Sequence, residues 1–305
     1  MATLVLLAAG MSTRYGRLKQ VDPMGPCGAS IMDYNVYDAL RAGFSEVVFV
    51  TRPEIEEEVR AHVAEIIGGA LPTAFVLQTL EELPPAFAPP PDRTRPWGTA
   101  HAVLCAADAV EGPFAVCNAD DLYGSMAFRS LHDHLSTTPL TTEAAMVGYI
   151  LQDTLSGRGG VSRGICVLGR DRLLESVTEI SEIRRVEGWI EGEDDDGAPV
   201  ELRGHEVVSM NLWGFSEPVV AAMRRQFRRF LGRWGADTDA EFPLSTALSE
   251  QVRLRSVRVA VLPGGDAWFG VTHPADRDEA RATLAARIAE GLYPDNLVAA
   301  FRAFG

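Results

Sequence analysis

Lysine is almost absent from this 305-residue sequence, and several other absences narrow the classes of protein to which it can belong. Lys19 is the one lysine among 28 basic residues. With 42 acidic residues the formal net charge is −14, which argues against nucleic-acid binding because that binding needs clustered cations. No apolar run approaches the roughly 20 residues of a membrane-spanning helix, so no membrane partner is expected. An anionic substrate must therefore be held by a few local positive groups.

Cysteine is also scarce, and its placement excludes a disulfide framework. Cys27, Cys105, Cys117 and Cys166 are scattered without metal-ligand spacing, which indicates reduced thiols in a cytoplasmic protein. Residues 4–9 are apolar, but no basic region precedes them and no cleavage-like site follows. We interpret them as a first strand rather than a signal peptide.

The first half of the chain alternates short β-rich runs with longer helical ones. Strands are expected over 3–8, 46–51, 74–78 and 114–117, with helices over 31–42, 53–67 and 99–109. Such alternation predicts an α/β fold with a Rossmann-like, doubly wound and mostly parallel mixed sheet. Ligands of these sheets bind beyond the carboxyl ends of the strands, which directs attention to the loops 9–19, 78–98 and 118–124.

Beyond residue 142 the pattern changes to strands separated by turns. Strands are expected over 143–150, 163–168, 207–215 and 254–262, and helices over 217–231, 275–290 and 295–303. We find no internal repeat and no linker-like stretch, so the sequence predicts a single domain over 1–305. Helical segments dominate its last part, from 236 to 305.

The loop after the first strand carries small residues followed by cations. It runs from Leu7 to Lys19 as LAAGMSTRYGRLK, which is neither a Walker loop nor a dinucleotide-binding G-x-G-x-x-G fingerprint. Backbone amides of small residues can approach phosphates closely, and Arg14 and Lys19 would add positive charge. The alternative is a turn whose Arg and Lys side chains face solvent.

This loop resembles the opening signature of the sugar-phosphate nucleotidyltransferases, the nucleotide-sugar pyrophosphorylases. Two further segments follow in the order of that family. Residues 98–103 read GTAHAV, which is similar to a segment of N-acetylglucosamine-1-phosphate uridylyltransferases. Residues 114–121 read FAVCNADD, which resembles the strand ending in the aspartate that binds magnesium. The resemblance covers roughly residues 1–135.

The resemblance implies a GT-A-like fold and an Mg²⁺-dependent enzyme that joins an NTP to an acceptor phosphate and releases pyrophosphate. The nucleotide-binding half would span about 1–140, the acceptor-binding half about 141–235 and a C-terminal extension 236–305. The catalytic residues implied are Arg14, Lys19 and Asp120. The nucleotide-binding residues implied are Ala8, Ala9, Gly10, Met11, Ser12, Thr13, Gln78, Gly98 and Thr99.

The resemblance also implies acceptor-binding and metal-binding residues, on fewer matching motifs. The acceptor-binding set is Asn118, Arg163, Glu179 and Asn211, and the metal set is Asp120, Asp121 and Asp266. Asp266 is included because residues 266–272 resemble a W-x-D-x-G-T element in which Gly270 takes the place of the aspartate. Alternatives stay open: the two adjacent aspartates could cap a helix, Asn211 could be a core amide, and Trp97 could cover the base or pack inside.

The chemistry of nucleotidyl transfer agrees with this set. The attacking phosphate oxygen is already anionic, so alignment and charge neutralisation replace a general base. The fork of Arg14 can bridge two phosphate oxygens, whereas Lys19 is a compact charge on a flexible stem that can follow the α-phosphate as it inverts.

The substrates are left open by the sequence. UTP is the first choice because Gln78 and the GTAHAV segment resemble those of uridylyltransferases, and the acceptor would be a sugar 1-phosphate. One alternative is a phosphocholine or polyol-phosphate cytidylyltransferase; another is a non-catalytic nucleotide-sugar-binding protein. The segment between Gln78 and Gly98 is longer than in those relatives and is expected to lie over the base and acceptor site.

A stripe of arginines on the predicted helix 217–231 raises the question of partners. Arg224, Arg225, Arg228 and Arg229 share one side of it. A solvated face is the simpler interpretation, and a surface between copies of a homo-oligomer is the alternative.

Overall fold

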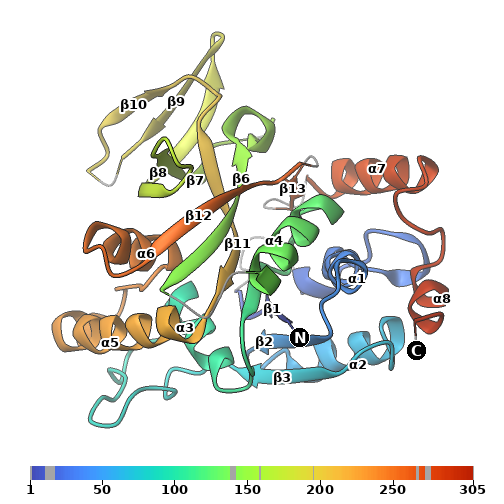
Figure 1. Ribbon diagram of the computed structural model, residues 1–305, viewed down its shortest axis with the longest axis horizontal. Coiled ribbons are helices and arrows are strands. Elements are labelled where there is room, and N and C mark those ends of the chain that lie inside the picture. The colour runs from blue at the N-terminus through green and yellow to red at the C-terminus, as the bar shows by residue number, and fades with distance from the viewer. Residues whose placement is uncertain are drawn as a thin grey trace.

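Four neighbouring strands form a parallel part of a larger mixed sheet (Figure 1). Their order is β3 (Thr73–Leu77), β2 (Glu46–Thr51), β1 (Thr3–Leu7) and β4 (Phe114–Asn118). In the register Leu7 lies between Val50 and Asn118, so the strands end level with one another at one edge. The computed structural model describes residues 2–10, 18–137, 142–157, 159–194, 196–265, 268–271 and 276–304.

Helices cover both faces of this sheet. Successive residues of a strand point to opposite faces and therefore pack against different helices. Leu4 and Leu6 pack with α1 (Ile31–Ala42), α2 (Glu56–Ile66) and α4 (Ser125–Thr137). Val5 packs on the other face with α3 (Thr99–Ala107), α5 (Glu217–Trp234) and α6 (Leu244–Arg253). Because β1 is apolar on both faces, it can lie between the two layers.

The second half of the chain extends the sheet with antiparallel strands. β11 (Val207–Phe215) pairs with β4, β7 (Val161–Leu168) and β6 (Glu143–Ile150), and β12 (Arg258–Pro263) runs parallel to β6. β8 (Leu174–Val186), β9 (Trp189–Glu193) and β10 (Pro199–Leu202) continue it into an arm at the top of Figure 1.

β11 changes partner along its length, and this change creates the site. Its first residues, Val207 to Ser209, pair with β7, whereas Trp213 to Phe215 pair with β4. The register against β6 shifts between Ser209 and Trp213, so β11 bulges there. β4 and β7 therefore diverge on either side of the bulge.

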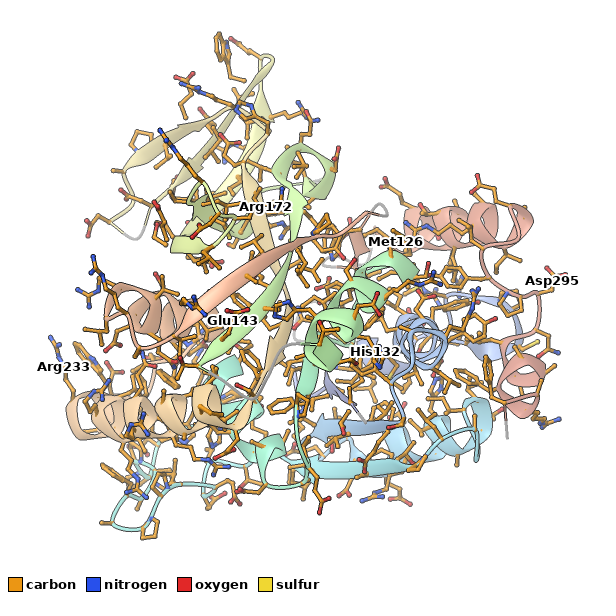
Figure 2. The ribbon with its side chains drawn as sticks, viewed as in Figure 1. Met126, His132, Glu143, Arg172, Arg233 and Asp295 are labelled. Carbon is orange, nitrogen blue, oxygen red and sulfur yellow. The ribbon has the colours of Figure 1, made fainter. Side chains whose placement is uncertain are left out.

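The C-terminal segments return to the N-terminal half. Buried residues of α7 (Asp276–Ala289) and α8 (Leu297–Arg302) belong to the same hydrophobic cluster as those of α1. The strands β13 (Phe269–Gly270) and β5 (Asp121–Leu122) form a small antiparallel sheet that joins segments far apart in the sequence. Short 3₁₀ turns lie at η1 (Lys19–Val21), η2 (Pro26–Gly28) and η3 (Leu151–Thr154). At the opposite end, the exposed Arg233 projects from α5 (Figure 2). None of the described helices is long and apolar enough to cross a membrane.

The predicted fold, a Rossmann-like mixed sheet with flanking helices and a C-terminal helical extension, is confirmed. The predicted helix 31–42 and strands 46–51 and 207–215 match α1, β2 and β11. The helix α6 was not predicted, although its buried positions Leu244, Ala247, Leu248 and Gln251 follow a helical period. The single-domain boundaries stay a prediction.

Candidate active site

A cavity of about 1230 Å³ opens at the carboxyl ends of β1, β3 and β4 and reaches β7, β8 and β11. Ala8 lies outside its lining, fully buried with its N–H donated to Val50 O (2.8 Å). Met11, Ser12, Thr13, Arg14 and Asp266 lie outside the described residues. The other residues predicted for the site all line the cavity: Ala9, Gly10, Lys19, Gln78, Gly98, Thr99, Asn118, Asp120, Asp121, Arg163, Glu179 and Asn211.

Lys19 and Asp120 form an ion pair in the lining of this cavity. Lys19 Nζ lies 2.5 Å from Asp120 Oδ2, and the two side chains are 14% and 34% exposed. Lys19 opens η1, whereas Asp120 follows β4. The pair places a mobile cation and a carboxylate where the predicted phosphate loop meets the sheet edge.

Two contacts hold the backbone around Lys19, and the sequence analysis missed both. The buried Gln20 side chain donates from Nε2 to Gly10 O (3.0 Å), which ties the two ends of the loop together. On the far side Arg277 of α7 donates from Nη2 to Asp22 Oδ1 (2.9 Å), and its Nε lies 2.8 Å from Oδ2. The C-terminal extension thus anchors the segment that carries Lys19.

Asp121 lies deeper than Asp120 and belongs to a hydrogen-bonded group. Asn118 Nδ2 donates to Asp121 Oδ2 (2.8 Å). Burial and the charge of Asp120 raise the pKa of Asp121 to about 7, against the opposing effects of Asn118, Lys19 and Arg163. Burial and the neighbouring carboxylate therefore disfavour the charged form of Asp121, and a further cation beside it would favour that form.

Gln78 lines the cavity directly after β3. Its Nε2 donates to Gly98 O (3.0 Å) and approaches His101 Nδ1 (3.3 Å). His101 is fully buried with Nε2 2.7 Å from Glu82 O, and burial lowers its pKa, so it stays neutral with Nδ1 as the acceptor. These partners orient the carboxamide and leave Gln78 Oε1 as the atom available to a ligand.

Gly98 and Thr99 meet a backbone segment from the C-terminal part of the chain. Phe242 N–H donates to Trp97 O (2.7 Å) and its carbonyl accepts from Ala100 N (3.1 Å). A Cβ at position 98 would lie 2.6 Å from Phe242 O, and the φ of Gly98 is +105°, so only glycine fits. Thr99 Oγ1 accepts from Leu244 N (2.9 Å), which fixes the start of α6.

The long segment between Gln78 and Gly98 was expected to lie over the site, but most of it does not line the cavity. Only Arg95 and Pro96 of the residues between Gln78 and Gly98 line it. Trp97 is fully buried, with Nε1 donated to Leu80 O (3.0 Å), and the guanidinium of Arg93 stacks on its ring at 3.6 Å. Trp97 therefore packs inside rather than over a base.

One wall of the cavity comes from α6, which was not predicted. Ser249 Oγ donates to Val177 O (3.1 Å) and accepts from Val177 N, so α6 is fastened to β8. The α6 residues that line the cavity are Ser245, Thr246, Ser249, Glu250 and Arg253.

Asn211 is a cavity residue, not a core amide. It lies in the bulge of β11 with φ +59°, a left-handed conformation that strands do not normally contain. The bulge breaks the side-chain alternation of the strand, and Asn211 lines the cavity next to Met210.

Arg163 and Glu179 lie on the adjacent strands β7 and β8. Arg163 is buried and donates to Thr154 Oγ1 (3.2 Å), Thr154 O (2.5 Å) and Ser162 O (2.8 Å). Its guanidinium also lies 5.0 Å from the Trp268 ring centroid. Much of its donor capacity is therefore used within the fold, whereas Glu179 is exposed on β8.

Comparison with known proteins gives the family. A sequence model of the nucleotidyl transferase family matches residues 4–155, which contain the loop, Gln78 and the aspartate pair. The chain belongs to the nucleotidyltransferase family. This nucleotidyltransferase also resembles the inositol-1-phosphate CTP transferase from T. maritima: the TM-score is 0.63 at 15% identity, over 96% of this chain and 98% of that one. No curated protein matches the sequence.

The nucleotidyltransferase has an unusual contact beside its aspartates. β13 lies antiparallel to β5 with Gly270 opposite Asp121. A Cβ at position 270 would lie 2.2 Å from Asp121 Oδ1, so the carboxylate occupies the space of a side chain there. Among the described residues no group of three or more His, Cys, Asp or Glu side chains forms a complete metal site.

Proposed function

We propose that this nucleotidyltransferase moves a nucleoside monophosphate from an NTP, UTP being the first choice, to the phosphate of a sugar 1-phosphate, with release of pyrophosphate. The observation that carries the proposal is the single cavity that joins the Lys19–Asp120 edge to a hydroxyl- and amide-rich wall on β7, β8 and β11. Both substrates can meet there without an intervening barrier.

The residues near the sheet edge suit charge neutralisation. Asp120 and Asp121 would hold Mg²⁺, whose preference for carboxylate and phosphate oxygens their donor atoms fit. When bound, the ion would offset charge on the α-phosphate and the departing pyrophosphate. Lys19 would then exchange its contact with Asp120 for a phosphate oxygen. Arg14 is proposed to bridge phosphates from the loop.

Base selection is assigned to Gln78. Its Oε1 accepts hydrogen bonds, because Nε2 is committed to Gly98 O. An acceptor at this position suits uracil N3–H, and it also suits the exocyclic amine of cytosine. The carbonyl of Gly98 is held by Gln78 and the α3 start is fixed by Phe242, so this pocket is rigid before the nucleotide enters.

The acceptor side is polar and suited to a polyhydroxylated molecule. Asn211, Glu179 and the backbone around Gly164 offer both donors and acceptors to hydroxyl groups. Asn118 would meet the acceptor phosphate between the two halves. A homo-oligomer stays a proposal on the basis of the exposed arginines of α5.

A second candidate is a polyol-phosphate cytidylyltransferase. It is favoured by the resemblance over nearly the whole chain to a protein whose name gives it CTP and inositol-1-phosphate as substrates. The two candidates differ only in base and acceptor, so both use the same phosphate and metal residues.

Pyrophosphate release from a matrix of substrates tests both. UTP, CTP, ATP, GTP and dTTP are combined with sugar 1-phosphates, inositol 1-phosphate and phosphocholine in the presence of Mg²⁺. We expect release with a pyrimidine nucleotide and one acceptor class, and none after Asp120→Asn. Binding of nucleotide with no release for any pair would instead support the non-catalytic alternative.

A further inference from the structure

The bulge of β11 leaves a backbone carbonyl without its ladder partner. β11 contributes extra residues between Ser209 and Trp213, so Met210 O does not take part in the regular pairing with β6. A buried carbonyl without a hydrogen bond is costly, because its lost contact with water is not replaced. Something outside the sheet must satisfy Met210.

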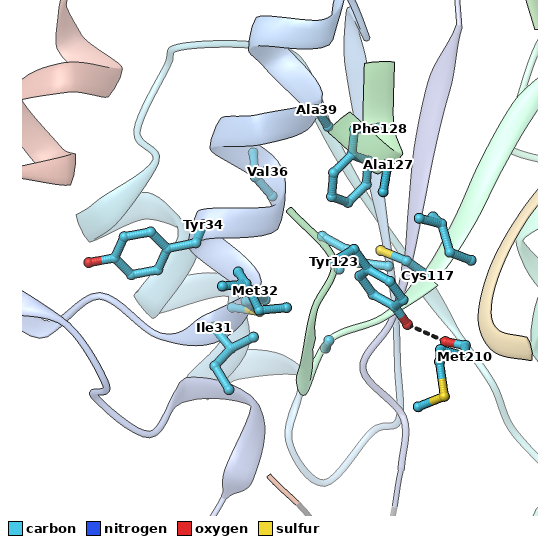
Figure 3. Close-up of a cluster of buried hydrophobic side chains, with 14 of the residues drawn as sticks. Ile31, Met32, Tyr34, Val36, Ala39, Cys117, Tyr123, Ala127, Phe128 and Met210 are labelled. Atoms are coloured by element: carbon cyan, nitrogen blue, oxygen red, sulfur yellow. Dashed lines mark hydrogen bonds between the residues drawn. The ribbon is translucent and has the colours of Figure 1, made fainter. Parts of the chain in front are cut away.

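Tyr123 supplies that contact. Its hydroxyl donates to Met210 O at 2.7 Å, and the side chain is fully buried among Cys117, Ala127 and Phe128 (Figure 3). The phenol carries one proton, so this short bond uses its donor. Its oxygen then accepts from Asn118 N–H (3.1 Å).

The same oxygen reaches the aspartate side of the site. It lies 3.4 Å from Asp121 Oδ2, the atom that accepts from Asn118 Nδ2. One buried hydroxyl thus contacts the end of β4, the aspartate of β5 and the bulge that carries Asn211.

The segment around Tyr123 is itself held from two sides. Asn35 of α1 donates from Nδ2 to Asp121 O (2.6 Å) and accepts from Tyr123 N (3.4 Å). Tyr149 donates its hydroxyl to Tyr123 O (2.9 Å). The phenol therefore projects from a rigid base, and a rigid donor can set the position of the bulge.

We propose that Tyr123 is a positioning residue for the acceptor: its bond to Met210 O holds the β11 bulge so that Asn211 faces the cavity, in register with Asp121. The proposal rests on the acceptor role given to Asn211 under the proposed function. Tyr123 does not line the cavity and touches no substrate. It acts through the backbone of β11.

Tyr123→Phe tests this, because it removes the hydroxyl and keeps the ring. The KM for the acceptor is expected to rise about tenfold, the effect of losing one buried hydrogen bond, while the KM for the NTP changes less than about twofold. Tyr293→Phe is the control: it removes another buried hydroxyl, which donates to Asp38 Oδ2 (2.7 Å) and contacts neither Tyr123 nor Met210. It should lower stability without changing the KM for the acceptor.

A double-mutant cycle with Asn211→Gly separates the two hypotheses. Glycine keeps the positive φ of the bulge and removes the amide, so the Tyr123→Phe change should add nothing to the acceptor KM in that background. Equal effects of Tyr123→Phe and Tyr293→Phe on the acceptor KM would overturn the positioning role. An unchanged acceptor KM for Asn211→Gly alone would instead count against the acceptor assignment.

Hydrogen exchange of the wild-type protein gives a test that needs no variant. The acceptor phosphate is expected to slow exchange over 207–213, which contributes Asn211 to the cavity, and also over 122–124, where no residue lines the cavity. Protection confined to 207–213 would contradict the coupling through Tyr123.

Discussion

Lys19 and Asp120 are 101 positions apart in the sequence, and their charged atoms lie 2.5 Å apart at the edge of the central sheet. In a chain with a net charge of −14, this is where the sole lysine is found. The pair joins the loop after β1 to the end of β4, two segments that parallel pairing brings level. A phosphate ligand entering the cavity would compete with Asp120 for the lysine.

Replacement of Lys19 by arginine is expected to lower kcat at least about tenfold while the fold survives. A planar fork cannot follow the α-phosphate as a compact ammonium does. Lys19→Met should cost about 100-fold or more, because the charge itself is lost. Steady-state pyrophosphate release and thermal unfolding would be measured together; a near wild-type rate for Lys19→Arg would contradict the special role of the ammonium.

Loss of the contact between Arg277 of α7 and Asp22 should weaken NTP binding at the Lys19 site, although Arg277 does not line the cavity. Arg277→Gln removes the ion pair between Arg277 and the fully buried Asp22 carboxylate, and we expect a loss of about 2 kcal/mol in unfolding free energy together with a raised KM for the NTP. Chemical denaturation and kinetics check the two effects.

Arg258→Gln is the matched control for that variant. It breaks an ion pair with Glu143 in which the arginine is 68% exposed, so its cost should be below about 1 kcal/mol with no kinetic change. If both variants behave alike, the anchor does not matter for Lys19.

The site residues that could be predicted from the sequence are those that lie just beyond the ends of parallel strands. Gln78 and Asp120 follow β3 and β4 closely, and Lys19 ends the loop that follows β1; parallel strands bring such loops to one edge. Because that geometry is generic, a motif on each strand end was enough to bring these residues together.

The features that could not be predicted from the sequence depend on contacts between residues far apart in the chain. The Tyr123–Met210 bond and the Asp22–Arg277 pair join residues 87 and 255 positions apart. No periodicity marks them, since each depends on how a bulge or a returning helix meets the sheet. The bulge at Asn211 is of the same kind: its segment reads as an ordinary strand, and only the change of partner from β7 to β4 shows the break.

Substitution of Gly270 is expected to disturb metal binding. The methyl group of Gly270→Ala would lie 2.2 Å from the present position of Asp121 Oδ1 and must displace that carboxylate. We expect Mn²⁺ affinity, measured by calorimetry without substrates, to fall about tenfold, corresponding to one weakened charged contact. Gly232→Ala in α5, where a Cβ would meet no atom within 4 Å, is the control and should bind Mn²⁺ normally.

A relocation variant sharpens that prediction. Asp121→Gly combined with Gly270→Asp moves the carboxylate to the facing strand and into the same space. It should recover Mn²⁺ affinity relative to Asp121→Gly alone. Equal weakness of the single and double variants would show that the space beside Gly270 is not where the metal is held.

His62 should make stability depend on pH through a buried pair far from the cavity. Its Nε2 lies 2.7 Å from Asp33 Oδ2, the atom that also accepts from the Ser30 N–H at the start of α1. Burial alone would lower the pKa of His62, but the hydrogen bond and charge of Asp33, with Glu65 and Glu58, raise it above the ordinary value of 6.5. The protonated form is therefore favoured by folding.

The sign of the effect follows from that direction. A pKa raised in the folded state contributes stability that is fully present below about pH 6.5 and is lost as the pH rises through the higher folded value. We expect the unfolding free energy, measured by urea denaturation from pH 5.5 to 9, to fall across this window. His62→Gln keeps a donor to Asp33 but cannot titrate, so subtraction of its profile isolates the histidine. Parallel profiles for the two proteins would show that the His62–Asp33 pair is not linked to folding, because a neutral imidazole would then serve equally well at the N-terminus of α1.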